Sequence, residues 1–158
     1  MSLVIARDDL SRAETRDLLT YHYSHMHENT PPEHVFALDL EGLKKPGITL
    51  WSAWEGEKIA GIAALRDLGD GLGEIKSMRT HPDFLRRGVA GKLLDHIVEA
   101  ATARGYRRLS LETGVGDDFT AAIALYESRG FAKGEKFADY PATEYNQFYH
   151  LDLTAPGA

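Results

Sequence analysis

The feature that most constrains this chain is a stretch in residues 72–95, where strand-like periodicity changes to helix-like periodicity across a basic turn. The segment from Glu74 to Thr80 contains apolar residues and no helix breaker, which predicts a strand. Pro82 ends that strand, because proline has no N–H to donate to a ladder. Apolar residues then follow helical spacing at Val89, Leu93, Leu94, Ile97, Val98 and Ala101. The pattern predicts a strand, a turn and a helix in direct succession.

The turn from Arg86 to Gly91 has the properties of an anion-binding site. The first turn of a helix presents unpaired N–H groups at the positive end of the helix dipole. Gly88, Ala90 and Gly91 carry little or no side chain, so a phosphate can approach the backbone. Arg86 and Arg87 add positive charge. A tight structural turn with solvated arginines fits the same spacing, and on local spacing alone both interpretations stay open.

Two other phosphate motifs fail on spacing. The P-loop requires Gly-Lys followed by Ser or Thr, and here Gly91 and Lys92 are followed by Leu93. The dinucleotide fingerprint requires three spaced glycines directly after the first strand, and this turn has two. A nucleotide-binding enzyme that recognises ATP or NAD at this turn remains an alternative, to be decided by calorimetry.

The segment Leu85-Arg86-Arg87-Gly88-Val89-Ala90 resembles the central motif of the GNAT acyltransferases, Gln/Arg-x-x-Gly-x-Gly/Ala. Gly88 and Ala90 match, and Leu85 departs from the usual Gln or Arg. The resemblance implies acetyl-CoA as co-substrate, with the turn amides holding its pyrophosphate. The positions that it assigns to cofactor binding are Met78, Arg79, Thr80, Arg86, Arg87, Gly88, Val89, Ala90 and Gly91.

A second segment, Ala122 to Phe131, is similar to the GNAT pattern Asn-x-x-Ala-x-x-Leu-Tyr-x-x-x-Gly-Phe. Matching residues are Ala122, Leu125, Tyr126, Gly130 and Phe131, whereas Phe119 stands where the family often has Asn. Packing explains Leu125 and Phe131, and a helix end explains Gly130. Packing explains Tyr126 less well, since a buried tyrosine needs a hydrogen-bond partner.

The two motifs together imply one GNAT domain spanning residues 1–158. Its fold class is α/β (α+β): a mixed, mostly antiparallel sheet of six to seven strands with about four helices, the fourth and fifth strands parallel and splayed. The expected strands are Ser2 to Ala6, Ile48 to Trp54, Lys58 to Leu65, Glu74 to Thr80, Arg107 to Thr113, one resuming at Gly130, and Gln147 to Leu153. The expected helices follow Asp8 to Ser11, start at Pro31, start at Val89, and run from a cap at Asp118 to Ser128, while Asp67 to Gly73 is expected to be a loop.

Composition bounds the class of protein. The chain has 158 residues, 43% hydrophobic and 27% charged, which is typical of a globular domain. It has no cysteine, which excludes disulfides, thiolate metal sites and a cysteine nucleophile and agrees with a reducing compartment. No early apolar run resembles a signal peptide or a membrane span, so we expect a cytoplasmic protein without a membrane partner. The formal net charge of −6 makes nucleic acid an unlikely partner.

The activity that the resemblance implies is direct transfer of an acetyl group from acetyl-CoA to an amine of a small molecule or peptide. It assigns Tyr126 to protonate or stabilise the departing thiolate. Backbone groups around Met78 and Thr80 are expected to hold the pantetheine arm. Glu74 lies where histone-type GNAT enzymes place a catalytic glutamate, Glu112 on the next strand is its rival, and ordered water is a third possibility.

Substrate choice in the family comes from segments that correspond here to Tyr21 to Pro32 and Ala138 to Tyr149. Tyr21, Glu112 and Tyr140 are therefore the candidate substrate residues. Strand alternation places Glu74, Lys76, Met78 and Thr80 on one face. Arg79, on the other face, is suited equally to a substrate carboxylate and to a surface ion pair.

Several alternatives remain. A non-catalytic acyl-CoA-binding regulator would keep the turn but have no use for Tyr126. His22, His25 and His27 make a metal site conceivable, but zinc needs three or four supported ligands, so we expect a polar surface and no metal. Resemblance to small GNAT enzymes also suggests a homodimer.

Overall fold

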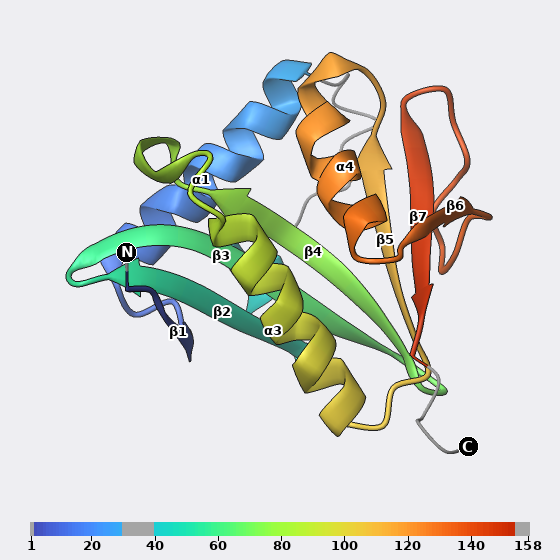
Figure 1. The fold of residues 1–158 in the computed structure, drawn as a ribbon, viewed down its shortest axis with the longest axis horizontal. Helices are drawn as coiled ribbons and strands as arrows, with labels where there is room; N and C mark the ends of the chain where they lie inside the picture. Colours follow the sequence, from blue (N-terminus) through green and yellow to red (C-terminus); the bar gives the residue numbers. More distant parts are fainter. Residues whose placement is uncertain (1, 30–39, 154–158) are drawn as a thin grey trace.

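The computed structural model describes residues 2–29 and 40–153, which fold into a seven-stranded sheet with helices on both faces (Figure 1). The strands are β1 (Val4–Arg7), β2 (Ile48–Glu55), β3 (Lys58–Gly69), β4 (Leu72–Thr80), β5 (Arg108–Gly114), β6 (Ala132–Gly134) and β7 (Asn146–Asp152). The helices are α1 (Ala13–Asn29), α2 (Leu40–Leu43), α3 (Val89–Ala103) and α4 (Thr120–Ser128), with short 3-10 turns η2 (Pro82–Phe84) and η3 (Asp117–Phe119).

The sheet order is β1-β2-β3-β4-β5-β7-β6. β4 and β5 pair in parallel, and the other neighbours pair antiparallel. The four helices in the described part of the chain and the mostly antiparallel sheet confirm the predicted fold class. The helix α3 connects the two parallel strands, as a parallel crossover requires.

Two hydrophobic clusters lie on opposite faces of the sheet. On the α3 face, Leu93 and Leu94 are fully buried with residues of α4 and of the strands. On the α1 face, Leu18 and Leu19 pack against β2 and β3. Figure 1 shows α3 and α4 in front of the sheet and α1 behind it. The apolar period predicted from Val89 onward therefore marks the buried side of a helix.

The connection between β3 and β4 differs from the sequence prediction. Asp67 to Gly73 was expected to be a loop, but β3 continues to Gly69 and β4 begins at Leu72. The turn consists of Asp70 and Gly71, which have φ angles of 56° and 78°. Positive φ at both central residues is the two-residue hairpin geometry that matches strand twist. Glycine-rich composition here produced a tight hairpin, not a long loop.

Other boundaries move by a few residues. The first strand starts at Val4, β5 starts at Arg108, and Gly130 and Phe131 precede β6. The expected cap at Asp118 is wrong, because η3 occupies that position and α4 starts after Phe119 with no side-chain cap bond. The helix expected from Pro31 lies outside the described residues except for the turn Leu40–Leu43.

Candidate active site

β4 and β5 share a ladder only at their beginnings. Three residue pairs are aligned, from Leu72 with Arg108 to Glu74 with Ser110. β4 then continues to Thr80 and β5 to Gly114, each still paired to its other neighbour. The facing edges diverge (Figure 1), which confirms the splayed pair expected from the sequence. The unpaired β4 edge offers backbone N–H and C=O groups to an extended ligand.

A β-bulge at Ser77 changes the direction of side chains along β4. Lys76 aligns with Ala64 and Arg79 with Ile62, so two β4 residues oppose one β3 residue. Ser77 has a φ of 53°, which is unusual for a residue with a side chain. The bulge therefore reverses the alternation over the second half of the strand.

The expectation that Glu74, Lys76, Met78 and Thr80 share one face is consequently wrong. Glu74 and Lys76 lie on the α1 face, and Arg79 joins them, because it contacts His22 of α1. Met78 packs into the cluster on the α3 face. Thr80 also lies on the α3 face. It is paired with Gly61 of β3, and a Cβ on Gly61 would point into α3, so the side chain of Thr80 points to the same face.

The gap between the strands opens into a cleft of about 160 Å³. Its walls come from α1, β4, β5, η3 and α4. Met78 and Tyr126 line the α3 side, while Lys76, Arg79 and Glu112 line the α1 side. The cleft thus connects the two faces of the sheet at the point where the strands separate.

The entrance of α3 retains the unpaired amides that the sequence predicted. Lys92 N donates to Gly88 O at 3.1 Å as the first helical bond, so the preceding helical amides have no acceptor within α3. Gly88 caps the helix in a left-handed conformation with a φ of 78° and no side-chain cap bond. Ala90 is partly exposed, but Val89 points into the core with 1% exposure, so only its backbone is available to a ligand.

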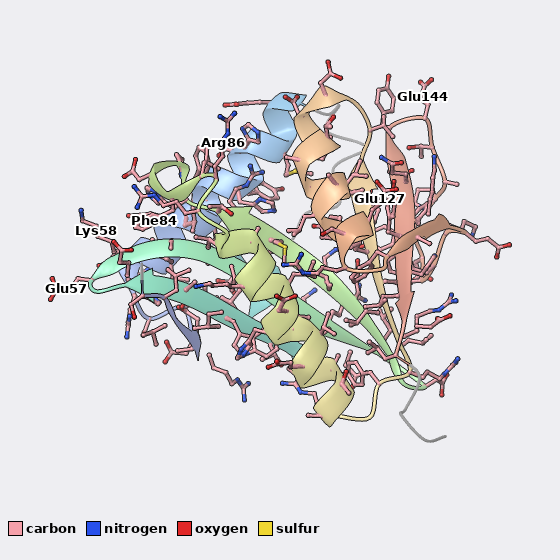
Figure 2. All side chains as sticks on the ribbon, in the orientation of Figure 1. Glu57, Lys58, Phe84, Arg86, Glu127 and Glu144 are labelled. Carbon is pink, nitrogen blue, oxygen red and sulfur yellow. The ribbon has the colours of Figure 1, made fainter. Side chains whose placement is uncertain are left out.

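The two glycines of this turn have different reasons for being glycine. A Cβ on Gly88 would meet nothing within 4 Å, so its requirement is conformational. A Cβ on Gly91 would lie 2.8 Å from a guanidinium nitrogen of Arg129, the flexible end of a long side chain, so this glycine leaves room for that guanidinium over α3. Arg86, labelled in Figure 2, is exposed on the loop before α3. Arg87 is exposed as well. The Arg87 guanidinium lies 5.4 Å from the ring centre of Phe84.

Tyr126 extends from α4 to the cleft. Its ring lies 5.8 Å from that of Phe131, and its hydroxyl approaches Met78 Sδ at 3.9 Å. Burial raises the pKa of Tyr126 to about 12, against a smaller opposing effect of Arg79. The hydroxyl therefore keeps its proton at neutral pH and has only a weak sulfur acceptor in the described structure.

Glu74 is 1% exposed and is occupied by structural contacts. Its carboxylate accepts from Lys76 Nζ at 3.2 Å and from the Tyr140 hydroxyl, and Arg66 approaches it at 3.5 Å. Burial raises the pKa of Tyr140, and the Glu74 charge and hydrogen bond raise it further. The structure thus places Tyr140, expected in the substrate pocket, over Glu74, and neither residue lines the cleft.

Glu112 lines the cleft from β5. Burial raises the pKa of Glu112 to about 7, although a hydrogen bond with Asn146 and the charge of Lys76 act in the opposite direction. A carboxyl group with a pKa near 7 exchanges protons readily at neutral pH, which is the property of a general base.

Arg79 and His22 connect β4 to α1. Arg79 Nε donates to His22 Nδ1 at 2.9 Å. Burial, followed by the charge of Arg79, lowers the pKa of His22 to about 3, so this imidazole is a neutral acceptor. Burial also lowers the pKa of Arg79, but the guanidinium remains charged in any protein environment.

Tyr21 is the outermost of the predicted substrate residues. Its side chain is 43% exposed, its ring centre lies 5.8 Å from the Arg79 guanidinium carbon, and it stacks on His25 at 5.9 Å.

Within residues 2–29 and 40–153, no group of three or more acidic or histidine side chains is arranged to hold a metal. No helix in the same residues is both long and apolar enough to span a membrane.

Sequence reasoning missed two features of this site. The bulge at Ser77 has no signal in the residue pattern, since serine is not a residue that favours positive φ. The partnership of His22 with Arg79 joins residues 57 positions apart and depends on helix docking. Phe119, where the family often has Asn, lies in the cleft wall and covers Gly114, where a Cβ would meet its ring at 2.4 Å.

Comparison with known proteins gives consistent results. Residues 9–131 match the Acetyltransferase (GNAT) family. The chain is 49% identical over 149 residues to the uncharacterized N-acetyltransferase YedL of Escherichia coli (strain K12), covering 94% of each chain. It is 52% identical over 133 residues to the uncharacterized N-acetyltransferase YsnE of Bacillus subtilis (strain 168), covering 84% of this chain and 88% of the relative.

A solved structure supports the same fold. The crystal structure of a Klebsiella pneumoniae protein assigned to the acyl-CoA N-acyltransferases superposes with a TM-score of 0.81 and 25% sequence identity. The alignment covers 96% of this chain and 98% of that chain.

Proposed function

This chain belongs to the Acetyltransferase (GNAT) family and is an N-acetyltransferase that uses acetyl-CoA; we propose that its acceptor is the amine of a small molecule, that Glu112 is its base, and that Tyr126 stabilises the leaving thiolate. The observation that carries these roles is the cleft, which opens between β4 and β5 and is lined by both side chains.

Three features of the chain fit an extended ligand that bears a diphosphate and a thioester. The β4 edge beyond Glu74 has no strand partner on the β5 side. Among the described residues, the first N–H groups of α3 have no acceptor within the helix, so they can donate hydrogen bonds to a phosphate. Ser77 Oγ is buried at the cleft and has no hydrogen-bond partner among the described residues. A buried hydroxyl without a hydrogen-bond partner is unfavourable. A bound ligand that formed a hydrogen bond with Ser77 Oγ would remove this cost, which supports the proposal of a ligand site here.

Acetyl-CoA supplies an acyl group that is activated as a thioester. Glu112 takes a proton from the attacking amine, directly or through water, because an alkyl ammonium has no lone pair for attack. Tyr126 donates a hydrogen bond to the sulfur as the C–S bond breaks. With a pKa near 12, Tyr126 is a poor proton donor to a thiolate, whose ordinary pKa is about 8.5, so a hydrogen bond fits better than full transfer.

Glu112 is preferred over Glu74 as the base because of its surroundings. Glu74 is fully buried between Lys76 and Tyr140 and does not line the cleft. Glu112 lines the cleft and titrates close to neutral pH. We therefore assign Glu74 a structural role, in which its carboxylate holds Lys76 and Tyr140 on the α1 face of the sheet.

The test is thiol release from acetyl-CoA with a panel of amines, on wild type and on Glu112→Gln. Loss of most turnover in the variant, with acetyl-CoA binding retained in calorimetry, supports the proposal. Asp152→Asn is the matched control, since Asp152 pairs with Arg108 at 2.7 Å outside the cleft. Tighter binding of ATP or NAD than of acetyl-CoA contradicts the cofactor assignment.

A cytoplasmic homodimer is the proposed working form, on the basis of resemblance to small GNAT enzymes. The chain mass is 17.5 kDa, so light scattering of the purified protein separates one copy from two directly.

A further inference from the structure

We propose that the acceptor is a free amino acid, and that Arg79 binds its carboxylate while its amino group lies toward Glu112. This inference rests on the proposed function, because it names the class of substrate that occupies the same cleft.

The first observation is the state of the Arg79 guanidinium. Its Nε is held by His22 at 2.9 Å, and its carbon lies 5.8 Å from the ring centre of Tyr21. No carboxylate within residues 2–29 and 40–153 forms an ion pair with it. Arg108 and Arg129, by contrast, each hold an aspartate within 2.8 Å. A partly buried cation without a counter-ion is unfavourable, and a bound anion removes that penalty.

The second observation is orientation. An arginine has five N–H donors in a rigid fork, and here one of them is taken by His22. The outer pair of nitrogens makes no hydrogen bond to the described residues, and a carboxylate matches this pair with two parallel hydrogen bonds. Since the His22 imidazole is buried and neutral, it fixes the guanidinium without neutralising its charge.

The third observation is which anion can reach this position. The α3 entrance, which suits the diphosphate, lies with α3 and α4, whereas Arg79 contacts α1 on the opposite face of the sheet. The Arg79 side of the cleft is therefore the acceptor side. Lys76, the neighbouring cation on that face, is already engaged by Glu74 and Tyr140.

The fourth observation is the distribution of charge across the cleft. Arg79 stands on the β4 wall, while Glu112 and the exposed Asp118 stand on the opposite wall. A molecule with a carboxylate at one end and an amine at the other matches this arrangement. The cleft volume of about 160 Å³ is small, so it suits the polar end of an amino acid rather than a folded peptide.

The experiment compares amino acids with their decarboxylated amines at fixed acetyl-CoA: leucine with 3-methylbutylamine, methionine with 3-(methylthio)propylamine, and phenylalanine with 2-phenylethylamine. Wild type is expected to favour at least one amino acid over its amine by tenfold or more in kcat/KM. Arg79→Met is expected to lower kcat/KM for that amino acid by about 100-fold, mainly through KM, and to bring the ratio close to one. Arg79→Lys keeps the positive charge but lacks the paired N–H donors of the guanidinium, so it should retain part of the preference for the amino acid over its amine.

Arg108→Met is the control, because Arg108 lies outside the cleft, and it should keep the wild-type ratio. Equal turnover of acids and amines overturns the inference and leaves the acetyltransferase assignment standing. Acetylation of amines or peptides with no amino acid accepted overturns it as well. Failure to bind or consume acetyl-CoA at all is a different result, since it contradicts the proposed function itself.

Discussion

The guanidinium of Arg129, the residue that caps the C-terminus of α4, covers Gly91 on α3, so closely that a Cβ on Gly91 would stand 2.8 Å from one of its nitrogens. The same guanidinium is held by Asp95 through a bond of 2.8 Å to Nε. Gly91 therefore leaves room for this guanidinium over α3. Contact with Arg129 gives Gly91 a role that is separate from the proposed phosphate site.

We expect Gly88→Ala and Gly91→Ala to have opposite effects on stability. Gly88→Ala forces a side chain into a φ of 78° and should destabilise the protein by about 1 kcal/mol. Gly91→Ala gains up to about 1 kcal/mol of helix propensity and displaces only the flexible end of Arg129, so it should be at least as stable as wild type. Thermal unfolding measures both. A Gly91→Ala protein that is the less stable of the two contradicts this explanation.

Glu74→Gln and Glu112→Gln should separate structure from catalysis. Glu74→Gln leaves Lys76, which is 7% exposed, without its buried counter-charge and should destabilise the fold by about 3 kcal/mol. Glu112→Gln should fold normally and lose about 100-fold in kcat. Denaturant unfolding and thiol release on the same samples make the comparison. A stable Glu74→Gln protein with no turnover would return the role of base to Glu74.

The pH dependence of the rate follows from the raised pKa of Glu112. The base must be deprotonated, so kcat/KM should rise through about pH 7 and level off above it. The free amine of the acceptor adds a second rise at higher pH. Glu112→Gln should lose the lower rise and keep the upper one, which a profile from pH 5.5 to 9.5 resolves.

The same carboxyl should affect stability with a definite sign. The pKa of Glu112 is about 7 in the folded state and has an ordinary value of 4.5, so the folded protein binds this proton more tightly than the unfolded chain does. Protonated Glu112 therefore contributes its full share to the free energy of unfolding below pH 4.5. That contribution is lost as the pH rises through 7. Glu112→Gln lacks this loss, so its stability relative to wild type should increase by about 1–2 kcal/mol from pH 4.5 to 8, after allowance for partial exposure. A difference that is constant with pH contradicts the assigned titration.

The sequence predicted what depends on local pattern and motif, and missed what depends on the meeting of distant segments. The strand before Pro82, the helix from Val89 and the splayed strands follow from periodicity and from the motif around Gly88. The bulge at Ser77 follows from register against β3, which no local pattern encodes. The burial of Glu74 under Tyr140, on which the proposal of Glu112 as base rests, likewise joins residues 66 positions apart.

Tyr126→Phe tests the hydroxyl without disturbing its ring. The ring packs on Phe131, and among the described residues the hydroxyl has only Met78 Sδ as a partner, at 3.9 Å, so the variant should be as stable as wild type. Loss of the hydrogen bond to the leaving sulfur should lower kcat by about 10- to 100-fold, while calorimetry shows unchanged acetyl-CoA affinity. Because the pKa is about 12, wild type should show no decline in rate from this group below pH 10. Unchanged turnover would remove the proposed role and favour a binding protein.

Ser77→Ala tests whether the hydroxyl at the bulge belongs to the ligand site. Its Oγ is buried without a partner among the described residues, so removing it should leave the unliganded protein equally stable or more stable by about 1 kcal/mol. Alanine tolerates the left-handed φ of 53° about as poorly as serine does, so backbone strain does not change. If acetyl-CoA or the acceptor satisfies this hydroxyl, the variant should bind one of them about tenfold more weakly, as calorimetry and KM for each substrate will show. Ser77→Gly is the matched control for the backbone, since glycine relieves the φ strain while removing the same hydroxyl. Equal weakening in both variants assigns the loss to the hydroxyl, and full affinity in both shows that the buried group serves no ligand.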